Sequence, residues 1–274
     1  MNTEHMALLA GNGILPVEIY RSIKRSGAPL PQVYLMASDT APYDDEGIPY
    51  QRITNPFAVA MILTKMRFMG IRRLMMAGGV PKKDIYAQEK LDVGAEAILN
   101  DVRDCSDHSL LAGAVRYIEK FGIKVVTYDD VIPEMLAPEG HIAGPEPTDG
   151  QNDDCEYGLG ILKVILPMSF GQSIAVSNRA VVAVEAMEGT DRMISRVASL
   201  SRCGILIKGM RADQDRRYDL PVVGVNTLHA MHDAGLSGLF VEAGCVLILG
   251  REDFIREADS LGICVTGVPK CRFL

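Results

Sequence analysis

The stretch "LLAGNGILP", from Leu8 to Pro16, decides the fold class because an apolar strand runs through a glycine turn into a helix. Proline is well tolerated in the first turn of a helix, which supports a helix start near Pro16. The turn residues Gly11, Asn12 and Gly13 let an anion approach backbone N–H groups at the positive end of that helix. We therefore expect these three residues to bind a phosphate-bearing ligand, with a purely structural turn as the alternative.

The residues that follow alternate between apolar strands and helical patterns. Strands are expected at "QVYLMAS" and "RRLMMAGGV", with helices at about residues 15–25 and 57–69. This alternation at short intervals indicates a parallel sheet covered by helices. A second glycine turn, which includes Gly79, ends the strand "LMMAG" and is followed by Lys82. Open α/β sheets bind ligands at the carboxyl ends of their strands, so Gly79 and Lys82 are expected to face the same crevice as the first turn.

The next feature is a break in the pattern at residues 137–158, "APEGHIAGPEPTDGQNDDCEYG", which are rich in proline, glycine and acids. Without an apolar period, this segment is typical of a linker. It divides an expected Rossmann-like N-terminal domain with a parallel sheet, residues 1–136, from an expected C-terminal α/β domain, residues 159–274. Within the second domain, "SIAVS" and "AVVAVEA" predict a hairpin that turns at Asn178.

Composition and charge exclude several classes of protein. The 274 residues carry a formal net charge of -7, which argues against a nucleic-acid-binding surface. The six cysteines lie far apart without a CxxC pair, so neither a zinc site nor a disulfide framework is indicated. No charged-then-apolar leader opens the sequence, and the longest apolar run, residues 159–170, is interrupted by Lys163 and Pro167. We expect a cytoplasmic protein.

An acidic stretch, "VEAMEGTDRMISR" from Val184 to Arg196, places Glu185, Glu188 and Asp191 at every third position. Two interpretations stay open. Thr190 or Asp191 can cap the helix that follows, with acidic groups favouring its dipole. Alternatively, the end of a strand and the start of a helix hold oxygen ligands for a hard cation or for a water molecule that is to be activated.

A second charged stretch, "IKGMRADQDRRYDLP", follows a buried-looking strand. A solvated charged turn is the usual explanation for such a run. The alternative is phosphoryl chemistry, which needs carboxylates for Mg²⁺ or water together with cations that neutralise phosphate oxygens. Upstream, Gln172 in "SFGQS" could contact a ligand or only satisfy the backbone. The candidates of the charged stretch are Lys208, Arg211, Gln214, Asp215, Arg216, Arg217 and Asp219.

Taken in order, these segments resemble the LpxI family, the UDP-2,3-diacylglucosamine pyrophosphatases of lipid A biosynthesis. The likeness is carried by "AGNGILP", "GGVPK", "DHSLL", "IEKFGIKVV", "LAPEG", "FGQS", "AVEAMEGTDRMISR", "QDRRYDLPVVGVNTL" and "AGLSGLFVEAG", which cover nearly the whole chain. The resemblance implies Mg²⁺-dependent hydrolysis of UDP-2,3-diacylglucosamine to UMP and 2,3-diacylglucosamine 1-phosphate (lipid X), with the substrate between two domains. The sequence departs from the family pattern at His108, Ser169, Arg211 and Ala212.

Roles for these residues follow from the charge argument and the resemblance together. Asp215 with Asp191 or Glu188 is expected to be catalytic and to hold Mg²⁺, which takes one or two carboxylates beside phosphate oxygens and water. Lys208 and Arg217 would offset phosphate charge, and Thr190 or Gln214 would orient an oxygen. The remaining expected substrate-binding residues are Gly11, Asn12, Gly13, Gly79, Lys82, Gln172 and Asp219.

Two rival functions stay open. One is a nucleotide-sugar or lipid-binding regulatory protein without turnover. The other is a nicotinamide-dependent oxidoreductase, which is disfavoured because Pro16 occupies the position of the third fingerprint glycine and the nearest acid, Asp39, sits late. The expected partner is the nucleotide-sugar lipid, with no nucleic acid, transient contact with the inner membrane surface, and room for a homodimer.

Overall fold

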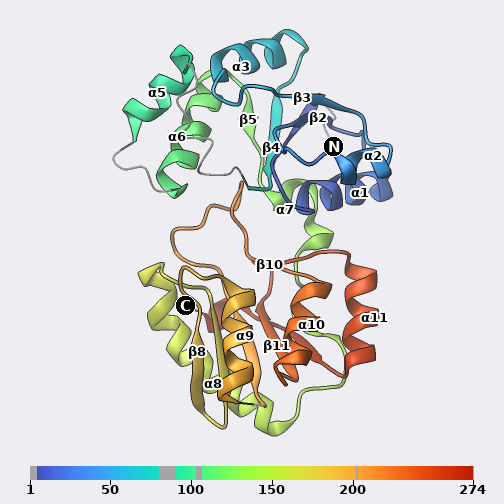
Figure 1. The fold of residues 1–274 in the computed structure, drawn as a ribbon, viewed down its shortest axis with the longest axis vertical. Helices are drawn as coiled ribbons and strands as arrows, with labels where there is room; N and C mark the ends of the chain where they lie inside the picture. The colour runs from blue at the N-terminus through green and yellow to red at the C-terminus, as the bar shows by residue number, and fades with distance from the viewer. Residues whose placement is uncertain (1–4, 80–90, 103–106, 202, 274) are drawn as a thin grey trace. The chain divides into compact units, whose positions relative to one another are not determined.

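The computed structural model describes residues 5–79, 91–102, 107–201 and 203–273 (Figure 1). The chain forms two compact units, which divide between Ile132 and Pro133. Each unit is an α/β structure with its own sheet. This architecture confirms the predicted two-domain α/β fold class.

The sheet of the N-terminal unit has five parallel strands in the order β3-β2-β1-β4-β5. The order reverses beside β1, so the carboxyl ends of β1 and β4 adjoin at the point where open sheets bind ligands. This is the expected Rossmann-like arrangement. Its strands are β1 (Met6–Ala10), β2 (Gln32–Leu35), β3 (Tyr50–Arg52), β4 (Arg73–Ala77) and β5 (Lys124–Val125).

Helix α1 shows how local sequence sets the boundaries of the N-terminal elements. It spans Leu15–Ser26, with Pro16 in its first turn and Gly27 in the left-handed conformation at its end. Proline at the start and glycine after the end are the residues that these positions favour. The other described helices of this unit are α2 (Ala41–Asp45), α3 (Val59–Phe68), α5 (Val93–Asp101), α6 (Asp107–Lys120) and α7 (Tyr128–Val131).

The sheet of the C-terminal unit has six strands in the order β6-β13-β11-β9-β7-β8. The strands β9, β11 and β13 are parallel, whereas β6 and β7 run antiparallel to their neighbours. A separate pair, β10 (Val222–Val223) and β12 (Leu247–Ile248), is also parallel. The six strands are β6 (Gly140–Ala143), β7 (Ser173–Ser177), β8 (Ala180–Val184), β9 (Ile205–Lys208), β11 (Gly238–Glu242) and β13 (Cys264–Val268).

Helices pack on both faces of this second sheet. One apolar cluster joins α8 (Asp149–Ile165) to Ile174, Ile207 and Phe240 of the strands. The other cluster joins α9 (Thr190–Leu200), α10 (Val225–Asp233) and α11 (Arg251–Leu261) to the opposite face. The inner strands β7, β9, β11 and β13 are therefore buried on both sides, which explains their nearly continuous apolar sequences.

The predicted linker over residues 137–158 is wrong, because this segment belongs to the C-terminal unit. It contains β6, which pairs antiparallel with β13, and the first ten residues of α8. The start of α8 is fixed by a capping box, in which Thr148 accepts from the Gln151 backbone and Gln151 bonds back to Thr148. Short edge strands and capped helix starts tolerate glycine, proline and acids, so the composition was misleading.

The predicted hairpin at Asn178 is confirmed by the antiparallel pairing of β7 with β8. Asn178 and Arg179 both have positive φ, at 51° and 55°. Two consecutive left-handed residues match the tight turn that the right-handed twist of a hairpin requires. The carboxylate of Asp154 in α8 accepts hydrogen bonds from both turn N–H groups, at 3.1 and 2.6 Å.

Candidate active site

The candidate residues of the C-terminal unit gather at one edge of its sheet. Strands β8, β9 and β11 run in one direction, so their carboxyl ends meet at this edge, and the antiparallel β7 begins there. The segments at this edge are the residues before β7, the turn from β8 to α9, the long loop after β9 and the end of β11. They carry Gln172, Glu188, Thr190, Asp191, Lys208, Gln214, Asp215, Arg217 and Asp219.

Lys208 is the most buried cation at this edge, with a relative exposure of 4%. Its Nζ donates to Thr190 Oγ1 at 2.9 Å and to the carbonyl oxygen of Val222 at 3.1 Å. Burial lowers the pKa of the Lys208 ammonium below its ordinary value, while the charges of Glu185 and Asp191 act in the opposite direction. The sheet thus holds a desolvated ammonium in a fixed position, and a preorganised cation of this kind can offset negative charge that develops beside it.

Thr190 and Asp191 do not cap helix α9, so the capping part of that interpretation is wrong, whereas Asp191 does place an acid in the first turn, where it favours the helix dipole. The helix begins at Thr190, its N-cap position is Gly189, and no side chain makes a capping hydrogen bond. Gly189 has φ 83°, which explains why glycine stands in this turn. The Thr190 hydroxyl is instead committed to Lys208, and Asp191 lies exposed in the first helical turn.

Glu188, the second acid of this stretch, contacts Arg196. The distance between Arg196 Nη2 and Glu188 Oε1 is 2.6 Å, and the same nitrogen donates to the carbonyl oxygen of Val184 at 3.0 Å. Arg196 therefore fastens the turn between β8 and α9 to the helix. Because surface ion pairs of this kind contribute little stability, the contact serves chiefly to orient the turn.

The loop from 209 to 221 is not a solvated charged turn. Gln214 is only 8% exposed. Its Oε1 accepts from the backbone N–H of Arg211 at 2.8 Å, and its Nε2 donates to Asp219 Oδ1 at 3.3 Å. Arg216 donates to the carbonyl oxygen of Gly244 at 2.6 Å, which ties the loop to the residues after β11. Gln214 is thus an internal brace of the loop.

Two acids of the loop make matching contacts with arginines two residues away. Asp215 accepts from Arg217 through both carboxylate oxygens, at 3.0 Å from Nε and 2.6 Å from Nη2. Asp213 pairs with Arg211 at 3.0 Å. Burial opposes ionisation of Asp213, but the Arg211 hydrogen bond and charge outweigh it and lower the carboxyl pKa. Asp213 also bonds Ser169, so two of the family departures, Ser169 and Arg211, share one partner.

Glu242 and Ser173 at this edge were not named from the sequence, and Glu185 was named only as part of the acidic stretch. Glu242, 3% exposed, ends β11 and accepts from the backbone N–H of Met210 at 2.7 Å. Glu185 is 6% exposed and Ser173 is 1% exposed. Among the described residues, Glu185 Oε2, Ser173 Oγ and Gln172 Oε1 are buried without a hydrogen-bond partner. Buried polar atoms left in this way are costly and point to a ligand or solvent partner.

The two glycine turns of the N-terminal unit lie side by side, as predicted for Gly11, Asn12, Gly13 and Gly79. The backbones of Asn12 and Gly79 exchange hydrogen bonds of 2.7 and 3.0 Å. A Cβ atom on Gly11 would stand 2.6 Å from the Gly79 carbonyl oxygen, so close backbone approach requires glycine there. Gly13 has φ 98° with open space around it. These turns form the carboxyl edge at the switch point of the sheet.

Four further residues named from the sequence have different outcomes. Lys82 lies outside the described residues. Asp39, the acid considered for a nicotinamide ribose, accepts from the backbone N–H of Ala41 at 3.1 Å and so supports the start of α2. His108 is exposed on α6, and Ala212 is exposed in the charged loop.

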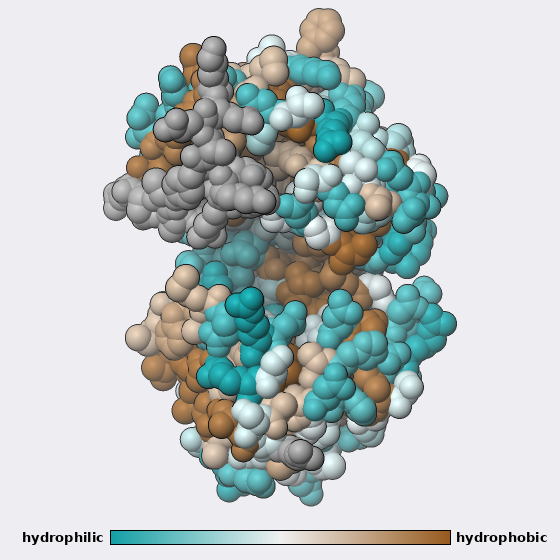
Figure 2. Space-filling view, viewed as in Figure 1, coloured by the Kyte–Doolittle hydropathy of each residue, from teal (hydrophilic) through white to brown (hydrophobic). Residues whose placement is uncertain are grey.

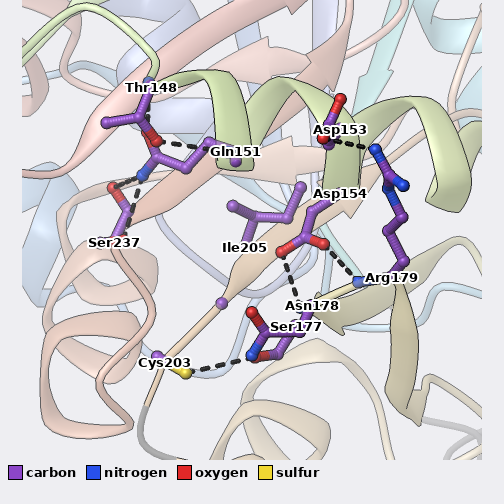
Figure 3. Close-up of a pocket in the computed structure, with 12 residues that line it drawn as sticks. Thr148, Gln151, Asp153, Asp154, Ser177, Asn178, Arg179, Cys203, Ile205 and Ser237 are labelled. Carbon is purple, nitrogen blue, oxygen red and sulfur yellow. Dashed lines mark hydrogen bonds and ion pairs between the residues drawn. The ribbon is translucent and has the colours of Figure 1, made fainter.

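A polar pocket of about 400 Å³ lies at the opposite edge of the C-terminal sheet (Figure 3). Its side chains bond to each other and to the backbone. Arg179 pairs with Asp153 at 2.5 Å, and Gln151 Nε2 donates to Ser237 Oγ at 3.1 Å. These contacts brace the hairpin turn and the start of α8, so the pocket has a structural explanation.

The side chains at the carboxyl ends of β8, β9 and β11 in the C-terminal unit determine which kind of metal ion this edge can hold. In the parts of the chain that the structure describes, no three His, Cys, Asp or Glu side chains cluster as a metal site. Glu188 and Asp215 already pair with arginines. This donor set would be compatible only with an ion such as Mg²⁺ that takes one or two carboxylates and draws its other ligands from phosphate and water.

The fold and the candidate site define a class of protein with two α/β domains. In the N-terminal unit, glycine turns follow the strands at one edge of the sheet, and in the C-terminal unit, charged and partly buried side chains gather at one edge of the sheet. The LpxI N-terminal domain profile matches residues 5–135, and the LpxI C-terminal domain profile matches residues 138–266. The chain belongs to the LpxI family. A relative from Caulobacter vibrioides, named UDP-2,3-diacylglucosamine pyrophosphatase LpxI, is 31% identical over 279 residues, covering 96% of this chain and 97% of the relative.

Proposed function

We propose that this protein hydrolyses the pyrophosphate bond of UDP-2,3-diacylglucosamine in lipid A biosynthesis, with UMP and 2,3-diacylglucosamine 1-phosphate as products. The observation that carries the proposal is the buried Lys208 ammonium beside Thr190, at the same sheet edge as the Asp215–Arg217 pair. The named activity of the 31% identical relative supports it.

In this proposal, some residues stabilise the negative charge of the phosphates and others position the attacking water. Lys208 stays fixed by its two hydrogen bonds, so its charge needs no reorganisation as negative charge develops on a phosphate oxygen. Asp215 orients the attacking water and accepts its proton. The water oxygen bonds to one phosphorus, and the bridging oxygen leaves with the other phosphate. Arg217 holds Asp215 in place and offers charge to the phosphates.

Mg²⁺ is part of the proposal. Asp215 with Asp191 or Glu188 would supply its carboxylate oxygens, and the pyrophosphate would supply others. When bound, the ion would neutralise phosphate charge and withdraw electrons from the phosphorus. Glu188 would have to leave Arg196 in order to take part. In the N-terminal unit, the turn at Gly13 would offer an anion the positive end of α1, whereas the Gly79 N–H is already bonded to the Asn12 carbonyl oxygen.

Membrane contact and a homodimer belong to the proposal as well. No helix in the described ranges is long and apolar enough to cross a membrane. Apolar residues gather at the surface near α8 and β8 (Figure 2). Val164, Met168 and Phe170 are 65%, 66% and 49% exposed. Exposed apolar groups of this kind favour brief contact with a lipid surface, from which a diacylated substrate must come, or with a second copy of the chain.

The direct test is incubation of the purified protein with UDP-2,3-diacylglucosamine and Mg²⁺, with UMP followed by chromatography and phosphorus by NMR. We expect equal amounts of UMP and the lipid phosphate. Tight binding without UMP would favour a regulatory protein, and bound nicotinamide in the purified protein would favour an oxidoreductase.

A further inference from the structure

Glu242, the last residue of β11, places a carboxylate at the carboxyl edge of the C-terminal sheet although it is only 3% exposed. Its Oε2 atom accepts a hydrogen bond from the backbone N–H of Met210 at 2.7 Å. Burial of a charged group is costly, and an apolar side chain of similar size often serves the stability of a fold as well. A carboxylate here therefore points to a task that an apolar residue could not perform.

Arg216 attaches the same loop to the turn that follows β11. Its Nη2 donates to the carbonyl oxygen of Gly244 at 2.6 Å, and its Nη1 lies 3.3 Å from Cys245 Sγ and 3.9 Å from Met210 Sδ. Arg216 directly follows Asp215 in the sequence, whereas Met210 precedes Asp215 by five positions. The end of β11 and its turn therefore hold the loop on both sides of Asp215.

Cys245, which is 1% exposed, connects these two attachments. Its side chain is hydrogen-bonded to Glu242, and its sulfur accepts from Arg216. Burial raises the pKa of the Cys245 thiol to about 11, and the charge of Glu242 and the hydrogen bond to it act in the same direction. The thiol therefore keeps its proton near neutral pH, so it can donate to the carboxylate while it accepts from the guanidinium. Buried polar networks of this kind rigidify the segments that they join.

The loop transmits this rigidity to Asp215 through its backbone. The N–H groups of Tyr218 and Asp219 donate to the carbonyl oxygen of Asp215 at 3.1 and 2.8 Å. The N–H of Arg217 donates to Asp215 Oδ1 at 2.9 Å. This turn is built around Asp215, so a shift of the neighbouring Arg216 would displace the Asp215 carboxylate. A displacement of about 1 Å can lower a rate on the order of a hundredfold.

We infer that Glu242 and Cys245 are positioning residues for Asp215, which act on the reaction only through the loop that they hold. The inference rests on the proposed function, in which Asp215 orients the attacking water. A role confined to folding would lower stability without a selective effect on kcat.

The kinetic test pairs Glu242→Ala with Asp154→Ala. Asp154 is the matched control because it is also a buried carboxylate that accepts from backbone N–H groups, at the opposite edge of the same sheet. UMP release from UDP-2,3-diacylglucosamine is measured with Mg²⁺. We expect Glu242→Ala to lower kcat at least about tenfold with little change in KM. Glu242→Gln, which keeps an acceptor for the Met210 N–H, should regain most of the rate, and Asp154→Ala should change neither constant. Equal losses of kcat in Glu242→Ala and Asp154→Ala would overturn the inference.

A double-mutant cycle tests whether Glu242 acts through Asp215. When Glu242→Ala is added to Asp215→Asn, kcat should fall no further, since the group that Glu242 positions is already lost. A full additional loss would overturn the inference. If Glu242→Ala does not fold, Cys245→Ala replaces it, with Cys264→Ala as its control because Cys264 of β13 is 0% exposed. The same outcomes then decide.

A measurement without turnover separates this inference from the proposed function. Arg217 Nε donates to both carboxylate oxygens of Asp215, at 3.0 and 3.1 Å, so exchange of this N–H with solvent reports on the position of Asp215. Measured by NMR, the exchange rate should rise at least about tenfold in Glu242→Ala and stay unchanged in Asp154→Ala. A parent protein that releases no UMP would end the proposed activity and leave the exchange comparison to decide the positioning role. An exchange rate that is unchanged in Glu242→Ala would overturn that role.

Discussion

The Nζ atom of Lys208 lies 2.9 Å from the hydroxyl oxygen of Thr190, a contact that joins the last residue of β9 to the first residue of α9. Thr190→Val keeps the shape of the side chain but removes this acceptor from a buried ammonium. We expect a loss of about 1.5–3 kcal/mol in the free energy of unfolding, the usual range for hydrogen bonds to charged groups. Urea denaturation measures it, and Thr190→Ser should restore most of the loss. Equal stability of the Val and Ser variants would show that the contact is unimportant.

Glu185 is predicted to set the pH range of activity through Lys208. Its carboxylate raises the pKa of Lys208 against the lowering effect of burial. In Glu185→Gln the negative charge that raises the pKa of Lys208 is lost, so the Lys208 ammonium should lose its proton at a lower pH. The alkaline limb of the kcat profile should therefore move to lower pH, while the acidic limb stays in place. An unmoved alkaline limb would mean that Lys208 does not act as a charged group in turnover.

Much of the fold was predictable because the strands are buried on both faces and the turns carry glycine. The elements that were missed lie in residues 137–158, where β6 is a four-residue edge strand. A signal for α8 was nevertheless present: Thr148 followed by Gln151 is a capping-box pattern. The composition of this segment indicated a linker, although the capping-box pattern at Thr148 and Gln151 already predicted the start of a helix.

The charged residues of the candidate site stand out in the sequence where they follow or interrupt an apolar pattern. Lys208 was identified in this way, and the same signal, a charge at the end of a buried strand, would have identified Glu242. The partners could not be predicted, since the Thr190–Lys208 and Met210–Glu242 contacts join residues 18 and 32 positions apart. Such pairings depend on the strand order, which no local pattern specifies.

Gly13 is predicted to matter for nucleotide binding. Both Gly13 and Gly27 have positive φ, at 98° and 71°, with open space where a Cβ atom would stand. Alanine at either site should cost about 1–2 kcal/mol of stability from backbone strain. Only Gly13 stands at the glycine-turn edge, so Gly13→Ala should weaken UDP binding in calorimetry, whereas Gly27→Ala should not. Equal UDP affinities in the two variants would make the first turn purely structural.

Metal removal should abolish turnover. The carboxylates of Asp215, Asp191 and Glu188 do not form a ready three-ligand cluster, so the ion should bind weakly without substrate. We expect EDTA to stop UMP release, Mg²⁺ to restore it, and the melting temperature to change little in either case. Hydrolysis that survives exhaustive chelation would remove the metal from the mechanism and leave these acids as structural charges.

The most direct test of the account compares Asp215 with Asp213, two acids of one loop that are both half-buried and both paired with an arginine two residues away. Asparagine at either position keeps the size of the side chain and removes one charge, so structural effects should be similar. The measurement is UMP release by Asp215→Asn and Asp213→Asn at saturating UDP-2,3-diacylglucosamine, with substrate affinity measured in parallel. We expect a loss on the order of a hundredfold or more in turnover for Asp215→Asn alone, with substrate affinity retained. Near-normal turnover in Asp215→Asn, or an equal loss in both variants, would contradict it.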